Sequence, residues 1–388
     1  MKYRDNPTRM LLTACVTTGL LLGGCQNSND SRMTDTGGSA GTPGAARPAT
    51  QSPPPRSGAI DLDVLERSRL REQALSVLEN AALSEWALLR ANALEGMSNV
   101  PTRVEPFVRT GLADENLGVR YSAAMIAGRL RLKETAPLVR PLLRDQDGSV
   151  RIAAMYALTR FGESVDLTPV SEALMRGSVR ERKVAAFVLG ELGERSAVPL
   201  LLDASRRLQS SDADVLPATE IRLLRLQIGE ALAKLGDESA RNAIRAALYP
   251  AATEELEASV LAAQILGEIR DADAAAELVR LVTRIAPGTT EHPDPMRRIY
   301  LYPKELRLAA ARSLAQLGYP DGWYVGLQYA RDPQPAVRAQ VAFVLSETRR
   351  SEDVVILERM LGDEDEIVRV SAAAGLLKVL EGPNRRGR

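Results

Sequence analysis

The feature that most constrains this chain is an alanine-rich apolar segment that recurs nine times, with an arginine near its start. Residues 150–158 read VRIAAMYAL, and similar segments begin at residues 119, 337 and 368. Five of the eight intervals between successive copies are 30 or 31 residues. Such self-similarity predicts an array of stacked units, each built from the same short motif. The arginine occupies positions 90, 120, 151, 182, 225, 307, 338 and 369, and Ser259 stands in the remaining copy.

Each copy is preceded by a second helical stretch, as in residues 134–145 and 351–363. One unit is therefore predicted to be a helix, a turn and a second helix. On a helical wheel, the third copy places its apolar residues within one arc, and this amphipathic stripe needs a partner to cover it. Aromatic residues make up only 4% of the chain, which favours close-packed helices over sheets. We therefore predict an all-α protein, an α-solenoid of about nine helix-turn-helix units.

The pattern resembles that of HEAT repeats, in particular the short class found in phycobilisome lyases and in many bacterial proteins. The resemblance rests on an aspartate six residues before the arginine, as in Asp145 and Arg151, followed by a pair of alanines and a leucine. It covers about residues 61–382. It implies a solenoid whose second helices line the concave side. Because this fold serves many functions, the resemblance says little about chemistry.

The recurring arginine is predicted to hold neighbouring units together. It falls at the edge of the apolar stripe, where its stem can pack and its head can meet an aspartate of the same or the next unit. Catalytic or phosphate-binding arginines would not recur in nearly every unit. The expected structural ladder comprises Asp114, Arg120, Asp145, Arg151, Arg182, Arg307, Asp332, Arg338, Asp363 and Arg369.

Positions opposite the core stripe of the second helices are expected to face the concave groove. In several units these positions carry large apolar side chains, where a solvated surface would carry polar ones. The alternative is that strong curvature of the array, or an error in the assumed helical phase, tucks these side chains between helices. The candidate partner-binding residues are Tyr121, Met125, Ile152, Tyr156, Phe187 and Phe343.

Two units exceed the regular spacing. The fifth is extended through residues 206–220, and the seventh carries PGTTEHPDPMRRIYLYP at residues 287–303 between its helices. This second insertion contains four prolines and His292, the one histidine of the chain, so we expect an irregular surface loop. Such loops often carry recognition, and a merely tolerated insertion is the simpler alternative.

The N-terminal residues 1–24 are predicted to be a signal peptide, with a positive start and an apolar run too short to span a membrane comfortably. The ending LLGGC at residues 21–25 resembles the bacterial lipobox. This resemblance implies cleavage before Cys25 and lipidation of that cysteine. By resemblance to Gram-negative sorting rules, Gln26 favours the periplasmic side of the outer membrane over the inner membrane.

The remaining segments complete the predicted domain organisation. Residues 25–58 comprise the lipidated cysteine and a tether rich in Gly, Pro, Ser, Thr and Ala, which is predicted to be disordered. Residues 59–382 are predicted to form the HEAT-repeat solenoid. Residues 383–388 are predicted to be a disordered basic tail.

Residue types suited to catalysis are sparse in this chain. A single histidine cannot build a multi-histidine metal site, and cleavage before Cys25 would leave no free cysteine as a nucleophile. Fifty basic and fifty acidic residues give a formal net charge of zero, so no overall field favours nucleic acid. We therefore expect no enzymatic activity, metal, cofactor, small-molecule substrate or nucleic-acid partner.

The resulting hypothesis is a membrane-anchored scaffold or adaptor in the bacterial cell envelope that binds a protein partner through its concave face. Two alternatives stay open. One is a HEAT-fold enzyme of bilin-lyase-like type, which a bound chromophore would reveal. The other is a HEAT protein that binds nucleic acid, similar to HEAT-like DNA glycosylases, with salt-dependent affinity. Export from the cytosol argues against both alternatives.

Overall fold

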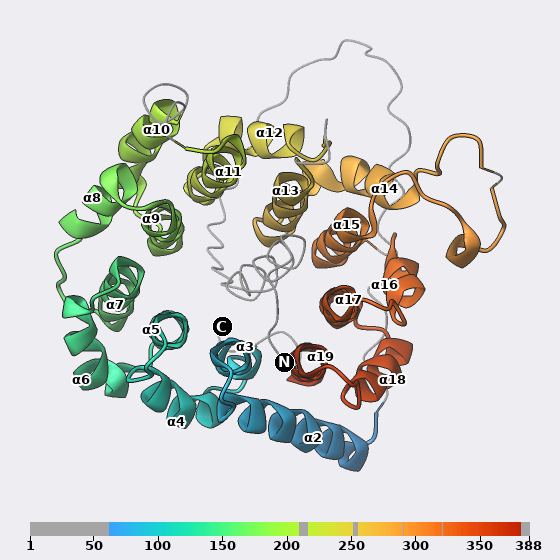
Figure 1. Ribbon diagram of the computed structural model, residues 1–388, viewed down its shortest axis with the longest axis horizontal. Helices are drawn as coiled ribbons and strands as arrows, with labels where there is room; N and C mark the ends of the chain where they lie inside the picture. The colour runs from blue at the N-terminus through green and yellow to red at the C-terminus, as the bar shows by residue number, and fades with distance from the viewer. Residues whose placement is uncertain (1–61, 209–215, 251–254, 290, 320, 382–388) are drawn as a thin grey trace, which may run out of the picture.

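The computed structural model describes residues 62–208, 216–250, 255–289, 291–319 and 321–381. Within these residues, eighteen α-helices form nine pairs, each with one outer and one inner helix (Figure 1). The β-structure of the described residues is an isolated bridge between Ile285 and Tyr300. The prediction of an all-α solenoid of about nine helix-turn-helix units is confirmed. Cys25, the predicted site of lipidation, lies outside the described residues.

The outer helices form the periphery of the molecule (Figure 1). In chain order they are α2 (Val64–Ala82), α4 (Pro101–Gly111), α6 (Ala136–Val139) continued by a 3-10 turn (Arg140–Arg144), α8 (Thr168–Arg176), α10 (Val198–Arg207), α12 (Glu238–Ala246), α14 (Ala275–Thr283), α16 (Trp323–Tyr329) and α18 (Ser351–Met360).

The inner helices contain the nine alanine-rich segments that the sequence pattern identifies. In chain order they are α3 (Ala87–Met97), α5 (Leu117–Leu130), α7 (Gly148–Phe161), α9 (Val179–Leu192), α11 (Ala218–Lys234), α13 (Leu256–Glu268), α15 (Lys304–Leu317), α17 (Pro335–Thr348) and α19 (Glu366–Glu381).

Glycines end several inner helices where the helical pattern stops. Gly162, Gly193 and Gly318 cap α7, α9 and α15 with φ angles of 92°, 74° and 85°. This left-handed conformation costs glycine little, because it has no Cβ to clash with the preceding turn. The chain can therefore reverse within a few residues and start the next outer helix.

The solenoid closes on itself and forms a ring. The last inner helix, α19, packs against α2 and α3 of the first unit (Figure 1). Across this seam, Arg67 donates to the carbonyl of Leu380 at 2.9 Å and Arg69 lies 2.9 Å from Glu358. One hydrophobic core runs through the first and last units alike. Nine units in one full turn correspond to a rotation of roughly 40° per unit, which is strong curvature for a repeat array.

Small residues let the inner helices approach closely enough for this curvature. A Cβ at Gly128 of α5 would lie 2.7 Å from the ring of Tyr156 and 2.8 Å from the backbone of Ala157, both on α7. At the seam, a Cβ at Gly96 of α3 would lie 3.0 Å from the Cβ of Ala374 on α19. Glycine and alanine at these positions therefore set the spacing of neighbouring inner helices.

Candidate functional site

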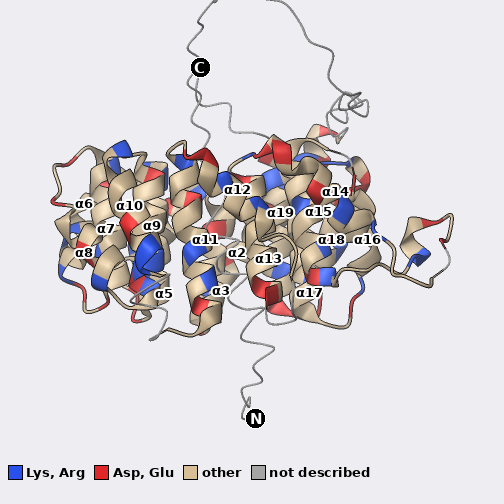
Figure 2. Ribbon diagram, turned by 90° about the horizontal axis from the view of Figure 1, so that it is seen from above, with Lys and Arg blue, Asp and Glu red and all other residues tan. Residues whose placement is uncertain are grey.

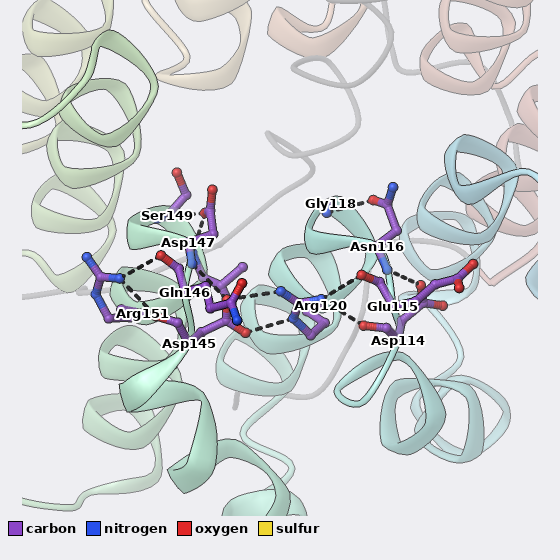
Figure 3. A network of polar contacts seen from close by, with 11 residues as sticks. Asp114, Glu115, Asn116, Gly118, Arg120, Asp145, Gln146, Asp147, Ser149 and Arg151 are labelled. Carbon is purple, nitrogen blue, oxygen red and sulfur yellow. Dashed lines mark hydrogen bonds and ion pairs between the residues drawn. The ribbon is translucent and has the colours of Figure 1, made fainter.

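The predicted ladder of arginines and aspartates joins neighbouring units near the starts of the inner helices (Figure 3). The Arg120 guanidinium donates to both carboxylate oxygens of Asp145 in the next unit, at 2.8 and 3.0 Å. Its remaining nitrogen donates to the main-chain carbonyls of Asp114 and Glu115. Equivalent contacts pair Arg90 with Asp114 and Arg338 with Asp363.

Each ladder aspartate also shapes the turn before its own inner helix. Oδ1 of Asp145 accepts from the main-chain N–H of Asp147 at 2.9 Å, and Oδ1 of Asp363 accepts from that of Asp365 at 3.0 Å. The same carboxylate therefore fixes a turn and receives the arginine of the preceding unit. This double role explains why the aspartate and the arginine recur together in the sequence.

Electrostatics favour the charged form of these carboxylates. Burial alone would raise the pKa of Asp145, but the Arg120 guanidinium and the N–H of Asp147 together hold that pKa below its usual value. The pKa values of Asp114 and Asp363 are lowered for the same reasons. The ladder thus consists of ionised, partly buried pairs that link one unit to the next.

Several predicted ladder residues make other contacts. The position that should offer Arg151 an aspartate carries Arg176, and the nearest carboxylate to Arg151 is that of Glu181 at 3.9 Å. The Arg182 guanidinium is buried, and its Nε donates to the carbonyl of Leu174. At the ring seam, the position that would face Arg369 carries Ser84, so the repeated pattern is interrupted there.

Arg307 departs furthest from the ladder. Its side chain is fully buried and donates to the carbonyl of Val282, the amide oxygen of Gln328 and the hydroxyl of Tyr329. The guanidinium carbon lies 3.4 Å from the centre of the Tyr300 ring. Asp332, the ladder aspartate of the next unit, instead accepts from Lys304 at 2.8 and 3.0 Å. Polar acceptors and an aromatic face thus replace the aspartate around this arginine.

The prediction of an exposed apolar strip on the inner helices is wrong for four of its six residues. The side chains of Tyr121, Met125, Ile152 and Tyr156 are buried, with Tyr156 only 1% exposed. The remaining two residues, Phe187 and Phe343, are half-buried. A cation lies over each of these two rings: Lys234 over Phe187 at 4.9 Å and Arg312 over Phe343 at 5.5 Å.

The curvature of the ring explains this burial. Tyr156 fills the space that Gly128 leaves on the preceding inner helix, so its ring packs between helices. A solenoid with less rotation per unit would separate these helices and expose the same positions. The alternative in which curvature tucks the rings between helices is therefore the arrangement in the structure.

A second set of charged contacts crosses the inner helices nearer their C-terminal ends, and the sequence analysis missed it. Gln316 on α15 donates to Glu268 on α13 and to Glu347 on α17, both at 3.0 Å. Lys378 on α19 donates to Glu347 at 2.6 Å. Burial raises the pKa of Glu268, whereas nearby Lys378 and Arg312 outweigh burial and lower that of Glu347. The sequence carries a signal for these contacts, because the eleventh position of most alanine-rich segments, counted from the segment's first residue, is polar. The polar residues at this position are Arg129, Arg160, Glu191, Lys234, Glu268, Gln316, Glu347 and Lys378.

The exposed large apolar side chains of the described residues lie on outer helices, turns and the insertion of the seventh unit, rather than on the inner helices. We call residues 284–289 and 291–303 the arm. One group of the exposed apolar side chains lies on and around this arm. The arm projects outward from the ring between α14 and α15 (Figures 1 and 2). This group comprises Tyr249, Met296, Ile299, Leu301 and Trp323.

The arm has a defined conformation. The antiparallel bridge between Ile285 and Tyr300 closes its base, and the Tyr300 hydroxyl donates to the carbonyl of Pro295 at 2.8 Å. Nδ1 of His292 accepts from the N–H of Asp294 at 3.0 Å, and Arg298 donates to the carbonyl of His292. The histidine thus shapes the loop. The expected surface location of this insertion agrees with the structure.

The described part of the chain offers neither a metal site nor a membrane span. Among its residues, no three His, Cys, Asp or Glu side chains converge in a way that could hold a metal ion. Within the same part of the chain, no helix has both the length and the apolar character needed to cross a membrane. Basic and acidic residues are intermixed over the side of the ring seen in Figure 2.

Comparison with solved structures finds other proteins of low similarity. An engineered protein is 17% identical, with a TM-score of 0.30, and covers 81% of this chain and 95% of its own. Human deoxyhypusine hydroxylase in complex with glycerol is 17% identical, with a TM-score of 0.33, and covers 72% of this chain and 98% of its own. Kap121p is 13% identical, with a TM-score of 0.31, and covers 81% of this chain but 43% of its own.

Sequence comparison gives the more specific finding. No curated protein matches this sequence. The family model of HEAT repeats matches residues 105–183 and 301–377, and that of the PBS lyase HEAT-like repeat matches residues 181–207. The matched segments include α5, α7, α15, α17 and most of α19, whose arginines form or adjoin the ladder. The chain therefore contains HEAT repeats, here closed into a ring.

Proposed function

We propose that this protein is a scaffold or adaptor that binds a protein partner at the cell envelope and that a lipid on Cys25 holds it at the membrane. The observation that carries the proposal is the HEAT-repeat ring itself. The charged side chains that recur in the ring form contacts between its own units. Its exposed large apolar side chains remain for contact with other molecules. In this proposal the protein has no catalytic role.

The location rests on the N-terminal sequence. The LLGGC ending at residues 21–25 supports cleavage and lipidation at Cys25, and the tether that follows would let the ring stand away from the lipid surface. We propose the periplasmic side of the outer membrane as the site of attachment.

The outer side of the ring is the better candidate for partner contact. Four of the side chains expected to line a concave binding face are buried, so they cannot meet a partner without rearrangement. The outer helices, the turns and the arm carry apolar side chains that a partner could cover. The proposal therefore moves the contact surface away from the inner helices.

The experiment is photo-crosslinking in intact cells with the full-length tagged protein, followed by membrane fractionation. The expected result is a discrete protein adduct in the membrane fraction. Replacing Cys25 (Cys25→Ser) should move the protein out of that fraction and reduce the adduct. A protein that stays membrane-bound without Cys25 would contradict the lipid anchor. The absence of any protein adduct to the wild-type chain would contradict the scaffold function.

A further inference from the structure

The base of the arm carries an extended segment whose side chains alternate between two faces. Ile299 and Leu301 are exposed, at 62% and 38% of their surface. Tyr300 and Tyr302 are half-buried and contact aromatic rings of the ring body, with centroids 6.1 Å from those of Tyr324 and Tyr249. This alternation is that of a β-strand with one covered face and one open apolar face.

The backbone of this segment has an unpaired edge. The N–H of Ala286 donates to the carbonyl of Ile299, and the N–H of Leu301 donates to the carbonyl of Arg284, both at 2.9 Å. These two bonds flank the bridge between Ile285 and Tyr300, so the N–H and C=O of Tyr300 point away from the paired strand. Within the described residues, neither of these Tyr300 groups makes a backbone hydrogen bond.

The open face also carries one basic group, Arg284, for which the described residues supply no ionic partner. Because Arg284 stands opposite Leu301 in the bridge, both side chains belong to the same face. The two carboxylates of the arm are already engaged: Glu291 lies 3.2 Å from Arg298, and Asp294 lies 3.8 Å from Arg297. No ion pair involves Arg284 within the described residues. A carboxylate from outside would therefore complement this face.

The arm is held in place before any partner arrives. The Arg307 guanidinium lies against the ring of Tyr300, and Gln328 on α16 donates to the carbonyl of Met296. A preformed edge loses little conformational entropy when another strand pairs with it. Unpaired edges of this kind are natural templates for added strands.

We propose that the arm binds an extended segment of the protein partner by β-strand addition along Tyr300. The segment has alternating apolar side chains that cover Ile299 and Leu301, and a carboxylate that reaches Arg284. Main-chain hydrogen bonds hold the segment, and the alternating side chains select it. This inference rests on the proposed function and names the surface and the chemistry through which the partner is recognised.

The test is selection from a displayed library of short random peptides on the full-length protein. We expect enrichment of peptides in which apolar residues alternate and at least one residue is acidic. The double variant Ile299→Asp with Leu301→Asp should bind the selected peptides roughly tenfold more weakly or worse. The control Val355→Asp, at a 56% exposed position on α18, should leave their binding unchanged.

Backbone methylation distinguishes strand addition from other modes of binding. Two versions of a selected peptide would carry N-methyl groups on every second backbone amide, one on the odd-numbered and the other on the even-numbered residues. One version should lose binding and the other should keep it, because alternate N–H groups of a strand point to opposite edges. Enrichment of basic or helix-patterned peptides would overturn the inference. So would an empty selection, or peptides indifferent to the double variant or to methylation.

The same double variant separates the two levels of the proposal. If wild-type protein forms its adduct in cells and the double variant forms it equally well, the arm inference fails while the scaffold function stands. If the wild-type protein forms no adduct, the scaffold function fails. The peptide selection then tests separately whether the arm binds an extended segment.

Discussion

The guanidinium of Arg120 on α5 binds both carboxylate oxygens of Asp145, which itself fixes the turn before α7 (Figure 3). One residue pair therefore joins two adjacent HEAT units and shapes the second of them. The Arg120 side chain is 18% exposed and that of Asp145 is 7% exposed. Removing either partner would leave the other charge poorly solvated.

We expect Arg120→Ala to destabilise the ring by about 2–3 kcal/mol, because Asp145 and two carbonyls lose their donor. Arg109 provides the matched control, since its pair with Glu105 lies within one outer helix and both side chains are more than a third exposed. Arg109→Ala should change the free energy of unfolding by about 0.5 kcal/mol or less. Urea denaturation of both variants measures the difference. Equal effects would contradict a special role for the ladder.

Acid should weaken the same pair. The folded state lowers the pKa of Asp145, so its contribution is present above the unfolded pKa of about 3.9 and is lost as the pH falls through the folded value. Asp145→Asn removes this contribution. The stability difference between wild type and variant should be largest near neutral pH and shrink below about pH 4. Denaturation curves across this range test it, and a difference that grows in acid would contradict the account.

The ring seam can be strengthened by completing the ladder. Oγ of Ser84 accepts from the N–H of Trp86 at 3.1 Å, the same turn contact that the ladder aspartates make elsewhere. Ser84→Asp should keep this contact and add a carboxylate for Arg369. We expect a gain of about 0.5–1 kcal/mol. The gain should vanish when Arg369→Ala is added, which a double-mutant cycle measures. A gain that persists without Arg369 would assign the effect to the turn alone.

Two glycines on inner helices should respond oppositely to alanine. At Gly128 the new Cβ would collide with Tyr156 and with the backbone of Ala157, so Gly128→Ala should cost about 1–3 kcal/mol. At Gly229 the nearest atom is 3.5 Å away on Ile244. There alanine should stabilise α11 by up to about 1 kcal/mol through helix propensity. Thermal unfolding distinguishes the two, and a destabilising Gly229→Ala would contradict the packing described.

Local signals were enough to predict the helix pairs and part of the ladder. The recurring alanine-rich segment identified all nine inner helices, and the aspartate six residues before the arginine identified Asp145 and Asp363 as ladder residues. The departures also have local causes, since Arg176 stands where Arg151 would need an aspartate. The arm was recognised as a surface insertion by its prolines, but its strand edge depends on contacts that no local pattern reveals.

Ring closure and the burial of Tyr156 could not be read from the pattern. Both depend on the rotation between units, which accumulates from small packing details at each interface. The helical wheel shows which positions lie opposite the core stripe, but it cannot distinguish a solvated groove from a neighbouring helix. Gly128, which makes room for Tyr156, lies in a different unit. A search for small residues paired with large ones across units would have favoured the buried arrangement.

The most direct test of the closed ring is a disulfide between its first and last units. A Cβ at position 96 would lie 3.0 Å from the Cβ of Ala374, about half an ångström below the lower end of the range found across disulfides. We propose Gly96→Cys with Ala374→Cys in a chain carrying Cys15→Ser and Cys25→Ser, so that no other cysteine competes. Gly229→Cys with Ala374→Cys is the control.

Under mild oxidation, the closed ring predicts a monomer crosslinked within one chain, seen by intact mass and by faster migration on a non-reducing gel, and no such species for the control. An open solenoid would hold its first and last units apart. The closed ring would be contradicted if a normally folded protein kept free thiols at positions 96 and 374. Crosslinks at these positions that form only between chains would contradict it as well.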